Sequence, residues 1–595
     1  MIRQVPGEII DDSLIPIIVG VTGHRYLDST PDSEIVRVFD ELDEKYPYTP
    51  IIVLSPLAKG ADRLVARIAL ETTRRKGARI SLICPLPLEK EEYERDFTEA
   101  GSKAEFEMLL ERSFGWFAIP LADGNTNENI KDKKGDPRKK QYEAVGLYVA
   151  RHSHILLALW DGIDTPENIG GTSRIVKIRH ESKLIEEYHP LDDFESGPIY
   201  HFPIEKNKDG DLSIMPRCEI FPGGNIQEPL PEEPRQKQKS NAFYESLARL
   251  EIYNAAVSAP DEDFVDRVLL NKAALISEVD AKGLGGISRR LLDHYAVADT
   301  LAIQYQFSTG YAMLILFGLA FLALFCFEVY AHVFPEIGWV LAGYPSIIGI
   351  GLLIVYLAKR RRIQNKYLYF RTLAEFLRVH FFVRVLGSTN IIRPSLRKKD
   401  KLDWAGSVNR TMWAVMSYAE IGKDTEGKPG RAGSVSGNLK FVIDGWMRGQ
   451  AKYFQDLSDK YEKRLHRRHR YITGFFLAGP ALSVIFLLVE ALFHHPPWLK
   501  ENHEYIIVVI GTTLALAATV GGYTGRTGLA ATAERTHWMS DIFARAEVEL
   551  SRRLSNKDHE GAKLLIVELF EIALQENVDW LISGLDLEHQ LELPK

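Results

Sequence analysis

Four long apolar runs, whose only charged side chains are Glu328 and Glu490 near the ends of two of them, restrict the fold of this sequence more than any other feature. They cover about 307–330, 339–357, 471–493 and 505–523. A helix needs about 20 apolar residues to cross a hydrocarbon core of about 30 Å, and each run has that length or nearly so. Helices of soluble proteins rarely stay uncharged for so long, so the runs predict an all-α membrane region with four transmembrane helices.

Basic residues flank these runs on one side only. The clusters 359–362 and 466–470 adjoin the second and third runs, and Arg526 follows the fourth. The two short connections, AHVFPEIGW and HHPPWLKENHE, contain one lysine between them. Because lysine and arginine are retained on the cytoplasmic side, both connections are expected outside the cell membrane and every other soluble segment inside. The N-terminus has no apolar signal-peptide core, so we expect a multi-pass inner-membrane protein with cytoplasmic soluble parts.

The two pairs of runs resemble each other. One opens FSTGY and the other YITGF, and each is followed by an amphipathic stretch, YFRTLAEFLR or AERTHWMSDIF. These features indicate a repeated unit of a hairpin and a cytoplasmic helix, although chance similarity between apolar hairpins stays open. No Asp, Glu, Lys or Arg lies at mid-depth in any run, which disfavours a transporter. Small residues fill the fourth run, so this helix is expected to pack closely within or between subunits.

The first part of the chain has a different pattern. Short apolar runs at 17–21, 51–54, 80–84 and 155–160 alternate with helical patterns, notably 62–76. Nearly continuous apolar strands alternating with helices predict an α/β Rossmann-like domain with a parallel sheet covered on both faces. Ligands of such sheets bind at the carboxyl ends of the strands, so the residues that follow each strand are the candidates for a site.

Glycine, hydroxyl and basic residues follow these strands. The stretches are GVTGHR, SPLAKGADR and DG followed by GGTSR. Glycine lets backbone approach a ligand, a helix N-terminus presents N–H groups to anions, and Arg25, Lys59 and Arg174 add charge opposite phosphates. The candidate ligand-binding residues are Gly20, Thr22, Gly23, His24, Arg25, Ser55, Lys59, Gly60, Ala61, Asp62, Arg63, Leu86, Asp161, Gly162, Gly170, Gly171, Thr172, Ser173 and Arg174. Turn formation is the simpler alternative for each glycine-rich stretch taken alone.

The set VTGHR, SPLAKGADRLVA, ICPLPLEKEEYERDF, ALWDG and GGTSRIV, in this order over about 1–205, resembles the SLOG superfamily of Rossmann-like nucleotide-binding domains. That superfamily includes the "Lonely guy" phosphoribohydrolases and DNA-processing protein A. The hairpin units, with YFRTLAEFLR and the spacing of Trp446, Gln450 and Tyr453, are similar to the two-transmembrane effector domains fused to SLOG sensors in bacterial nucleotide-signalling immunity, CBASS-like or Thoeris-like. Membrane motifs are degenerate, so this second resemblance is less specific.

The resemblance also shows a departure. Hydrolytic members carry a PGGxGT signature followed by a catalytic glutamate, whereas Gly170–Arg174 here reads GGTSR and no acid follows before Glu181. Hydrolysis of an N-glycosidic bond needs carboxylates, and an arginine would oppose the positive charge that develops on the ribose. The domain is therefore expected to be a sensor, with no catalytic residue, no metal and no resident cofactor. Asp62 and Asp161 remain possible acids, with helix capping and turn formation as the simpler roles.

Composition shifts suggest the remaining boundaries. We expect a sensing domain at 1–205, a linker at 206–240, a helical connector at 241–306, a first hairpin with its helix at 307–390, a helical and loop segment at 391–470, a second hairpin at 471–526 and C-terminal helices at 527–595. A net charge of -7 disfavours a nucleic-acid-binding surface. The separated Cys84, Cys218 and Cys326 fit a reducing compartment without a disulfide framework or a zinc site.

These features together predict a ligand-gated membrane effector of antiphage defence. A nucleotide-derived messenger from a partner synthase, either a cyclic oligonucleotide or an ADP-ribose derivative, is the expected activator. The expected output is permeabilisation of the membrane by a homo-oligomer. A membrane-anchored nucleotide phosphoribohydrolase and a transporter or constitutive channel are the alternatives.

Overall fold

The structure, a computed structural model, divides into two compact units. It describes residues 3–4, 13–27, 30–76, 79–163, 170–181, 197–204, 218–220, 234–277, 280–281, 283–387, 408, 411–412, 414–415, 435–493 and 496–589. The head unit comprises Met1–Ala298 and Thr372–Ala432, and the membrane unit comprises Asp299–Arg371 and Gly433–Lys595. The boundary between the two units falls inside two helices.

The head unit is built on an eight-stranded sheet with the order β1-β5-β4-β3-β2-β6-β7-β8. The strands are β1 (Arg3–Gln4), β2 (Ile17–Gly23), β3 (Ile51–Leu54), β4 (Ile80–Leu86), β5 (Gly115–Ala118), β6 (Ile155–Trp160), β7 (Ile199–Pro203) and β8 (Cys218–Ile220). Only the edge pairs β1/β5 and β7/β8 are antiparallel. The predicted parallel sheet and its four predicted strands are confirmed. The short strands β1, β5, β7 and β8 were not predicted.

Helices cover both faces of this sheet. They are α1 (Asp32–Lys45), α2 (Ala61–Lys76), α3 (Lys90–Glu94), α4 (Ala100–Glu111), the short 3-10 helix η1 (Asn129–Lys131), α5 (Asp136–His152) and α6 (Thr172–Glu181). α1 packs against α2, and α5 packs against α6. Successive residues of a strand point to opposite faces, and along β2 Gly20 faces Val149 of α5 while Gly23 faces Ala61 of α2. The sheet is therefore wound on both sides, as a Rossmann-like domain is.

Helix α7 (Pro234–Ser258) closes the amino ends of the central strands. Asn254 accepts a hydrogen bond from the backbone N–H of Ile15 at 2.8 Å and donates to the carbonyl of Ile15 and to Thr49 Oγ1. Ile15 and Thr49 directly precede β2 and β3, so α7 lies at the sheet edge opposite the carboxyl ends. α7 begins within 206–240, the stretch predicted as a linker, and strand β8 also lies in this stretch. The remainder, 206–217 and 221–233, lies outside the described residues. Helix α8 (Glu262–Leu275) follows α7.

The membrane unit contains the four predicted spans. Its helices are α10 (Gly286–His332) and α12 (Ile363–Val385), which both begin or end in the head unit, α11 (Gly338–Arg361), α14 (Val435–Val442), the π-helical turn η3 (Ile443–Met447), α15 (Arg448–Leu492), α16 (Pro497–Glu501), α17 (His503–Arg526), α18 (Leu529–Ser555) and α19 (His559–His589). The helices α10, α11, α15 (with the α14 and η3 turns before it) and α17 are long and apolar enough to cross a membrane. The chain is accordingly a membrane protein with an N-terminal α/β part and a helical remainder.

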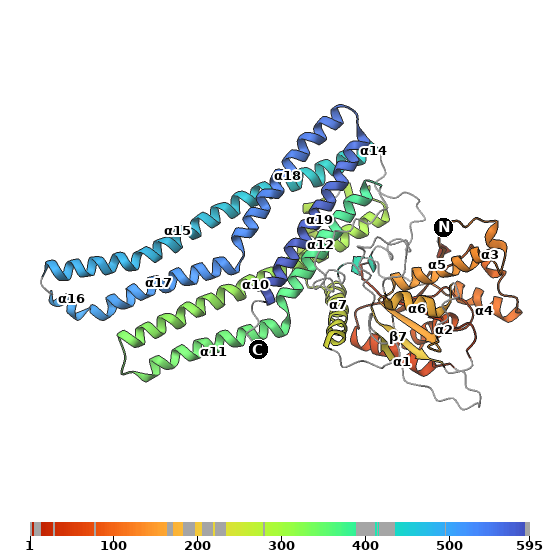
Figure 1. Cartoon of the computed structure of the whole chain (residues 1–595), viewed down its shortest axis with the longest axis horizontal. Coiled ribbons are helices and arrows are strands. Elements are labelled where there is room, and N and C mark those ends of the chain that lie inside the picture. The colour runs from red at the N-terminus through yellow and green to blue at the C-terminus, as the bar shows by residue number, and fades with distance from the viewer. Residues whose placement is uncertain are drawn as a thin grey trace. The chain divides into compact units, whose positions relative to one another are not determined.

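The spans are paired as expected. α10 lies beside α11, where a Cβ on Gly343 would come within 2.9 Å of Cys326 Sγ, and α15 packs along α17 (Figure 1). Each second span ends near a left-handed backbone residue, Arg362 (φ 49°) after α11 and Gly528 (φ 59°) after α17. The structure thus adds a shared backbone break to the similarity of the two hairpins. It also shows that α10 and α15 extend well beyond the apolar runs without interruption, which was not expected.

Candidate functional site

The centre of the candidate site lies where the order of the strands in the sheet reverses. From β2 the chain continues to β3, β4 and β5 on one side and later to β6 and β7 on the other. Such a reversal leaves a crevice at the carboxyl ends of the two central strands. Here His24, directly after β2, has its Nε2 3.2 Å from Asp161 Oδ1 and 3.2 Å from the Asp161 backbone N, directly after β6. The two turns are joined at the crevice.

The turns after β2 and β3 fit together through their glycines. The backbone N–H of Ala61 donates to the His24 carbonyl at 3.0 Å. A Cβ on Gly60, which has φ +92°, would lie 2.3 Å from that carbonyl oxygen, and a Cβ on Gly23 would lie 2.3 Å from Ala61 Cβ. Any side chain at either glycine would force the two turns apart. Both glycines are therefore required for this edge of the sheet to form.

The loop between β3 and α2 is held in a strained conformation. Leu57 has φ 58°, in the left-handed region that leucine rarely adopts. Ser55 Oγ stabilises it by accepting from the Leu57 N–H at 3.2 Å and donating to the Asp62 carbonyl at 2.9 Å. Strain of this kind persists only where the surroundings impose it, and it concentrates at ligand-binding sites.

Asp62 lies buried beneath this loop. Its Oδ2 accepts from the Ala58 N–H at 3.3 Å. Burial raises the pKa of the Asp62 carboxyl to about 7, although the Ala58 N–H and the charges of Arg25 and Arg63 act in the opposite direction. A carboxyl of this kind exchanges its proton near neutral pH, so the charge behind the loop depends on pH.

A cavity of about 100 Å³ opens beside the two turns. Arg25 and Lys59 from the predicted set line it. The rest of its wall comes from Tyr26 and Ala58, from the segment 93–102 and from Tyr142 of α5. Ligand pockets usually enclose about 300–1,000 Å³, so a nucleotide fits here only if part of the wall moves.

The cations of this site are held by neighbouring side chains. Lys59 Nζ donates to both carboxylate oxygens of Glu99, at 2.8 and 2.9 Å, which raises the pKa of Lys59. The Arg25 guanidinium lies 5.1 Å from the centre of the Tyr142 ring. Arg174, on the first turn of α6, is paired with Glu143 of α5. A phosphate that bound Lys59 or Arg174 would compete with a carboxylate for the same donors.

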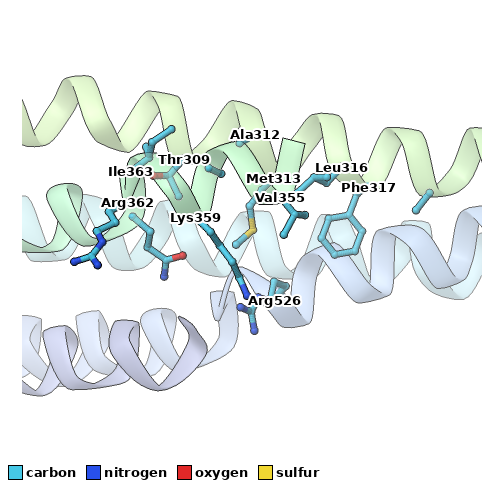
Figure 2. Close-up of a pocket in the computed structure, with 13 residues that line it drawn as sticks. Thr309, Ala312, Met313, Leu316, Phe317, Val355, Lys359, Arg362, Ile363 and Arg526 are labelled. Atoms are coloured by element: carbon cyan, nitrogen blue, oxygen red, sulfur yellow. The ribbon is translucent and has the colours of Figure 1, made fainter. Parts of the chain in front are cut away.

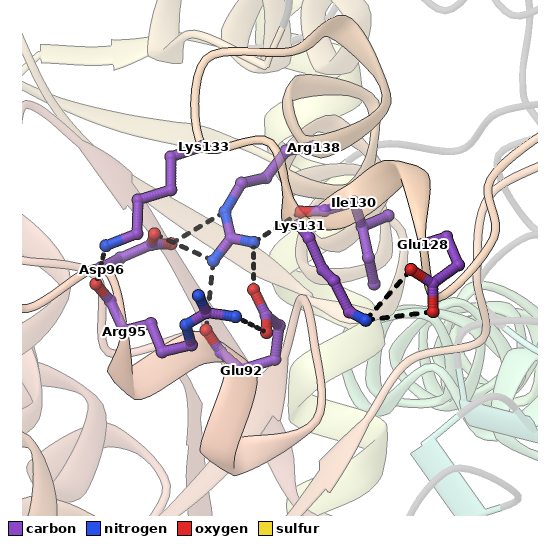
Figure 3. A network of polar contacts seen from close by, with 8 residues as sticks. All are labelled: Glu92, Arg95, Asp96, Glu128, Ile130, Lys131, Lys133 and Arg138. Atoms are coloured by element: carbon purple, nitrogen blue, oxygen red, sulfur yellow. Dashed lines mark hydrogen bonds and ion pairs between the residues drawn. The ribbon is translucent and has the colours of Figure 1, made fainter.

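Arg138 holds the wall segment 93–102 in place (Figure 3). Its buried guanidinium contacts Glu92 Oε1 at 2.8 Å and Asp96 Oδ1 at 2.9 Å, and donates to the Ile130 carbonyl at 2.6 Å. Although burial opposes it, hydrogen bonds from Arg138 and Arg95 lower the pKa of Glu92. Asp96 also accepts a hydrogen bond from Tyr142. The wall segment is therefore tied to α5 by charged groups.

The structure places the other predicted residues as follows. Gly170 (φ +77°) lies against α5, where its Cβ would be 2.9 Å from the Lys139 carbonyl, and Gly171, Thr172 and Ser173 begin α6 behind it. The residues ahead of them, 164–169, lie outside the described part. Gly162 is in open space after β6. Of the predicted residues, only Arg25 and Lys59 line the cavity. Gly20 and Thr22 lie inside β2, Leu86 is buried at the end of β4, and Arg63 and Arg174 do not line the cavity either.

Arg63 shows that a residue which follows a strand in the sequence does not necessarily face the cavity. It is 2% exposed and donates to the Leu57 carbonyl at 3.0 Å and to the Ser102 carbonyl at 2.6 Å. Its guanidinium thus braces the loop and the wall from behind. Gly20 likewise has a packing role, because a Cβ there would lie 2.8 Å from Ser153 and Val149.

Sequence reasoning did not find Tyr142, Asp96, Glu99 or Arg138. These residues come from α5 and from the stretch between α3 and α4, which no strand end marks. The only available signal was the charged and aromatic stretch EYERDF within the SLOG-like motifs, and it gives no indication of which side chains face the crevice.

The assembled site can hold anions but shows no metal cluster within the residues that the structure describes. Arg25 and Lys59 line the cavity, and Arg174 is a further cation at the first turn of α6, outside the cavity lining. Comparison of the chain with protein families and with curated proteins finds no match.

Proposed function

We propose that the chain is a membrane effector whose α/β domain binds a nucleotide-derived messenger and whose four spans respond by permeabilising the membrane. The proposal places the protein in bacterial antiphage defence, with a SLOG-type sensor fused to two-transmembrane effector units. The observation that carries it is the pairing of Lys59 with Glu99 and of Arg174 with Glu143 at one sheet edge. These pairs supply donors for phosphate and, at the same time, groups that must move when phosphate binds.

The movement gives binding a mechanical consequence. A phosphate on Lys59 displaces Glu99, which belongs to the wall between α3 and α4. Opening this wall enlarges a cavity that is too small for a nucleotide in the present state. A ligand shifts an equilibrium only by its preference for one state, so the messenger must bind the open wall better than the closed one.

Several further elements of the proposal rest on the sequence. The resemblance of VTGHR, SPLAKGADR and GGTSRIV to SLOG motifs supports nucleotide binding. The distribution of lysine and arginine around the spans supports a cytoplasmic sensor, with both termini inside and the membrane as its target. Pore formation by four spans per chain requires several copies, so the active form is a homo-oligomer. The messenger is a cyclic oligonucleotide or an ADP-ribose derivative made by a partner synthase.

Binding can be tested on the full chain in nanodiscs with cyclic dinucleotides, cyclic trinucleotides and ADP-ribose isomers as probes. The full chain is needed because helix α7, which lies outside residues 1–205, packs against the sheet of the head unit. We expect at least one probe to bind by calorimetry. Arg25→Ala and Arg174→Ala should each weaken it by about tenfold or more, because each removes a charge-assisted contact to phosphate.

Arg37→Ala is the matched control, because Arg37 is an exposed arginine of α1 that pairs with Glu41 away from the cavity. Its affinity should equal that of the unmodified chain. Unchanged affinity in both Arg25→Ala and Arg174→Ala would show that the messenger does not bind this edge of the sheet.

One observation favours the alternative of a membrane-anchored phosphoribohydrolase. Asp62, with its pKa raised by burial to about 7, is a carboxyl that can hold a proton at neutral pH. Incubating the full chain with nucleoside monophosphates and assaying free base distinguishes the two. Release of base that Asp62→Asn abolishes would establish the hydrolase, and binding without release would favour the sensor.

A further inference from the structure

A second and larger cavity lies in the membrane unit. It encloses about 350 Å³ between α10, the end of α11, the start of α12 and the last residue of α17 (Figure 2). Its wall is mostly apolar, with Met313, Leu316, Phe317 and Val355 among the lining side chains. It shares no lining residue with the cavity of the proposed messenger site, so its ligand is a separate question.

Charged side chains gather at one end of this cavity. Lys359 of α11 and Arg526 of α17 converge there, and Arg362, directly before α12, also lines the cavity (Figure 2). All charged residues among those that line the cavity in the described part of the chain are basic. An apolar compartment with a cationic end is complementary to a ligand that is apolar over most of its length and anionic at one end.

The backbone fixes the position of these cations. Arg362 has φ 49°, and its N–H donates to the Lys359 carbonyl at 3.0 Å, which ends α11 and turns the chain into α12. Left-handed backbone disfavours a residue with a Cβ, and glycine is the usual choice at such a helix end. An arginine here brings its charge to the cavity at the end of two spans, where the phosphate headgroups of a bilayer lie.

We propose that this cavity binds an anionic phospholipid, with the phosphate on Lys359, Arg362 and Arg526 and part of one acyl chain against the apolar wall. A soluble nucleotide has no chain to cover Met313, Leu316 and Phe317, whereas lipid tails surround the spans in a membrane. Burial of methylene groups in the cavity and charge-assisted hydrogen bonds at its end act on the same molecule.

The bound lipid touches both hairpins. α10 and α11 form the first, and Arg526 ends the second. The hairpins already meet nearby, where a Cβ on Gly522 would lie 3.1 Å from Phe317 Cε1 and the rings of Phe317 and Tyr523 are 5.5 Å apart. A lipid on Arg526 and Lys359 therefore reinforces this seam, and it stabilises whichever arrangement of the hairpins holds the three cations together.

The inference is independent of the messenger and can be tested on the full chain after exchange of its lipids. Phosphatidylglycerol, phosphatidylcholine and inorganic phosphate are the probes, and native mass spectrometry measures the lipid retained. We expect phosphatidylglycerol to be retained over phosphatidylcholine, and the double variant Lys359→Gln/Arg526→Gln to weaken its retention by about tenfold or more.

Arg360→Gln/Arg361→Gln is the charge-matched control, because both arginines are exposed beside Lys359 but do not line the cavity. This control should change retention by less than about twofold. A third variant, Ala312→Phe, fills the cavity while keeping every charge and should also lower retention.

Four results would overturn the proposal. Equal retention of phosphatidylglycerol and phosphatidylcholine would show that the cations do not select the headgroup. Displacement of phosphatidylglycerol by millimolar phosphate would show a site for a free anion. Full retention by Ala312→Phe, or equal loss in the basic double variant and its control, would show that the lipid binds elsewhere on the spans.

Discussion

The two cavities of this chain differ in how their cations are held. In the head unit, Lys59 and Arg174 are paired with Glu99 and Glu143, and the cavity is small and polar. In the membrane unit, Lys359, Arg362 and Arg526 lie at the end of a larger apolar cavity that no acidic side chain lines in the described residues. At Lys59 and Arg174 an anion competes with these carboxylates, whereas the membrane cavity is larger, mostly apolar and bordered by basic residues at one end.

This difference suits the head cavity to a ligand-dependent switch and the membrane cavity to stable binding of a lipid. A site whose cations are held by internal carboxylates couples binding to movement of the segments that bear those carboxylates. An apolar cavity with a cationic end gains affinity from burial of apolar surface together with charge-assisted contacts. We therefore expect the head cavity to carry the signal and the membrane cavity to set the resting arrangement on which the signal acts.

The largest expected effect that distinguishes the two cavities is the pH dependence of the stability of the head unit. Because the folded-state pKa of Asp62 is raised to about 7 from an unfolded value of 3.8, the folded state binds the proton more tightly. The contribution of Asp62 to stability is therefore greatest below the unfolded value, falls as the pH rises towards about 7, and is lowest above it. Asp62→Asn should remove this decline and raise the stability of the head at about pH 8.

The expected gain is at most a few kcal/mol, at about 1.4 kcal/mol for each pKa unit. Denaturation of the full chain, followed through the head, measures it at about pH 5 and pH 8. Lipid retention by the membrane cavity should not follow Asp62, so a parallel change there would break the distinction between the two sites. An unchanged pH dependence in Asp62→Asn would assign the decline to another group.

A smaller effect tests the competition at Lys59 directly. Glu99→Gln removes the carboxylate but keeps a side chain of the same size, so an anion no longer competes for Lys59. Pairs this exposed contribute little, and we expect an affinity gain for the binding probe of at most about fivefold. Glu107→Gln, an exposed glutamate of α4 that does not line the cavity, is the control. Weaker binding by Glu99→Gln would mean that Glu99 contacts the ligand itself.

The central strands were predicted well from the sequence because a buried strand appears there as a continuous apolar run. Strands β2, β3, β4 and β6 are buried along their whole length, and each was visible as a continuous apolar run. Strand β5 has only four residues, half-exposed beyond Gly115, and shows no such run. The continuity of α10 was also hidden, because its polar start and apolar end have different compositions although the helix does not stop between them.

The site was predictable only in part. Arg25 and Lys59 were found because they directly follow strands, and parallel strands bring such residues to one edge. Arg63 was included on the same ground, but the helical twist turns its side chain behind the loop. Glu99 and Tyr142 reach the cavity through tertiary packing of α4 and α5, and no local pattern encodes that contact. The membrane cavity was missed since its cations matched the expected flanks of the spans.

The most direct test of the account is flux through liposomes that contain the full chain, measured with and without the nucleotide probe that binds the head. The account predicts tight liposomes without the probe, release of an entrapped dye when the probe is added, and no release from Arg25→Ala. Release that does not depend on the probe, or binding of the probe with no release at any protein density, would contradict the claim that the head controls the membrane unit.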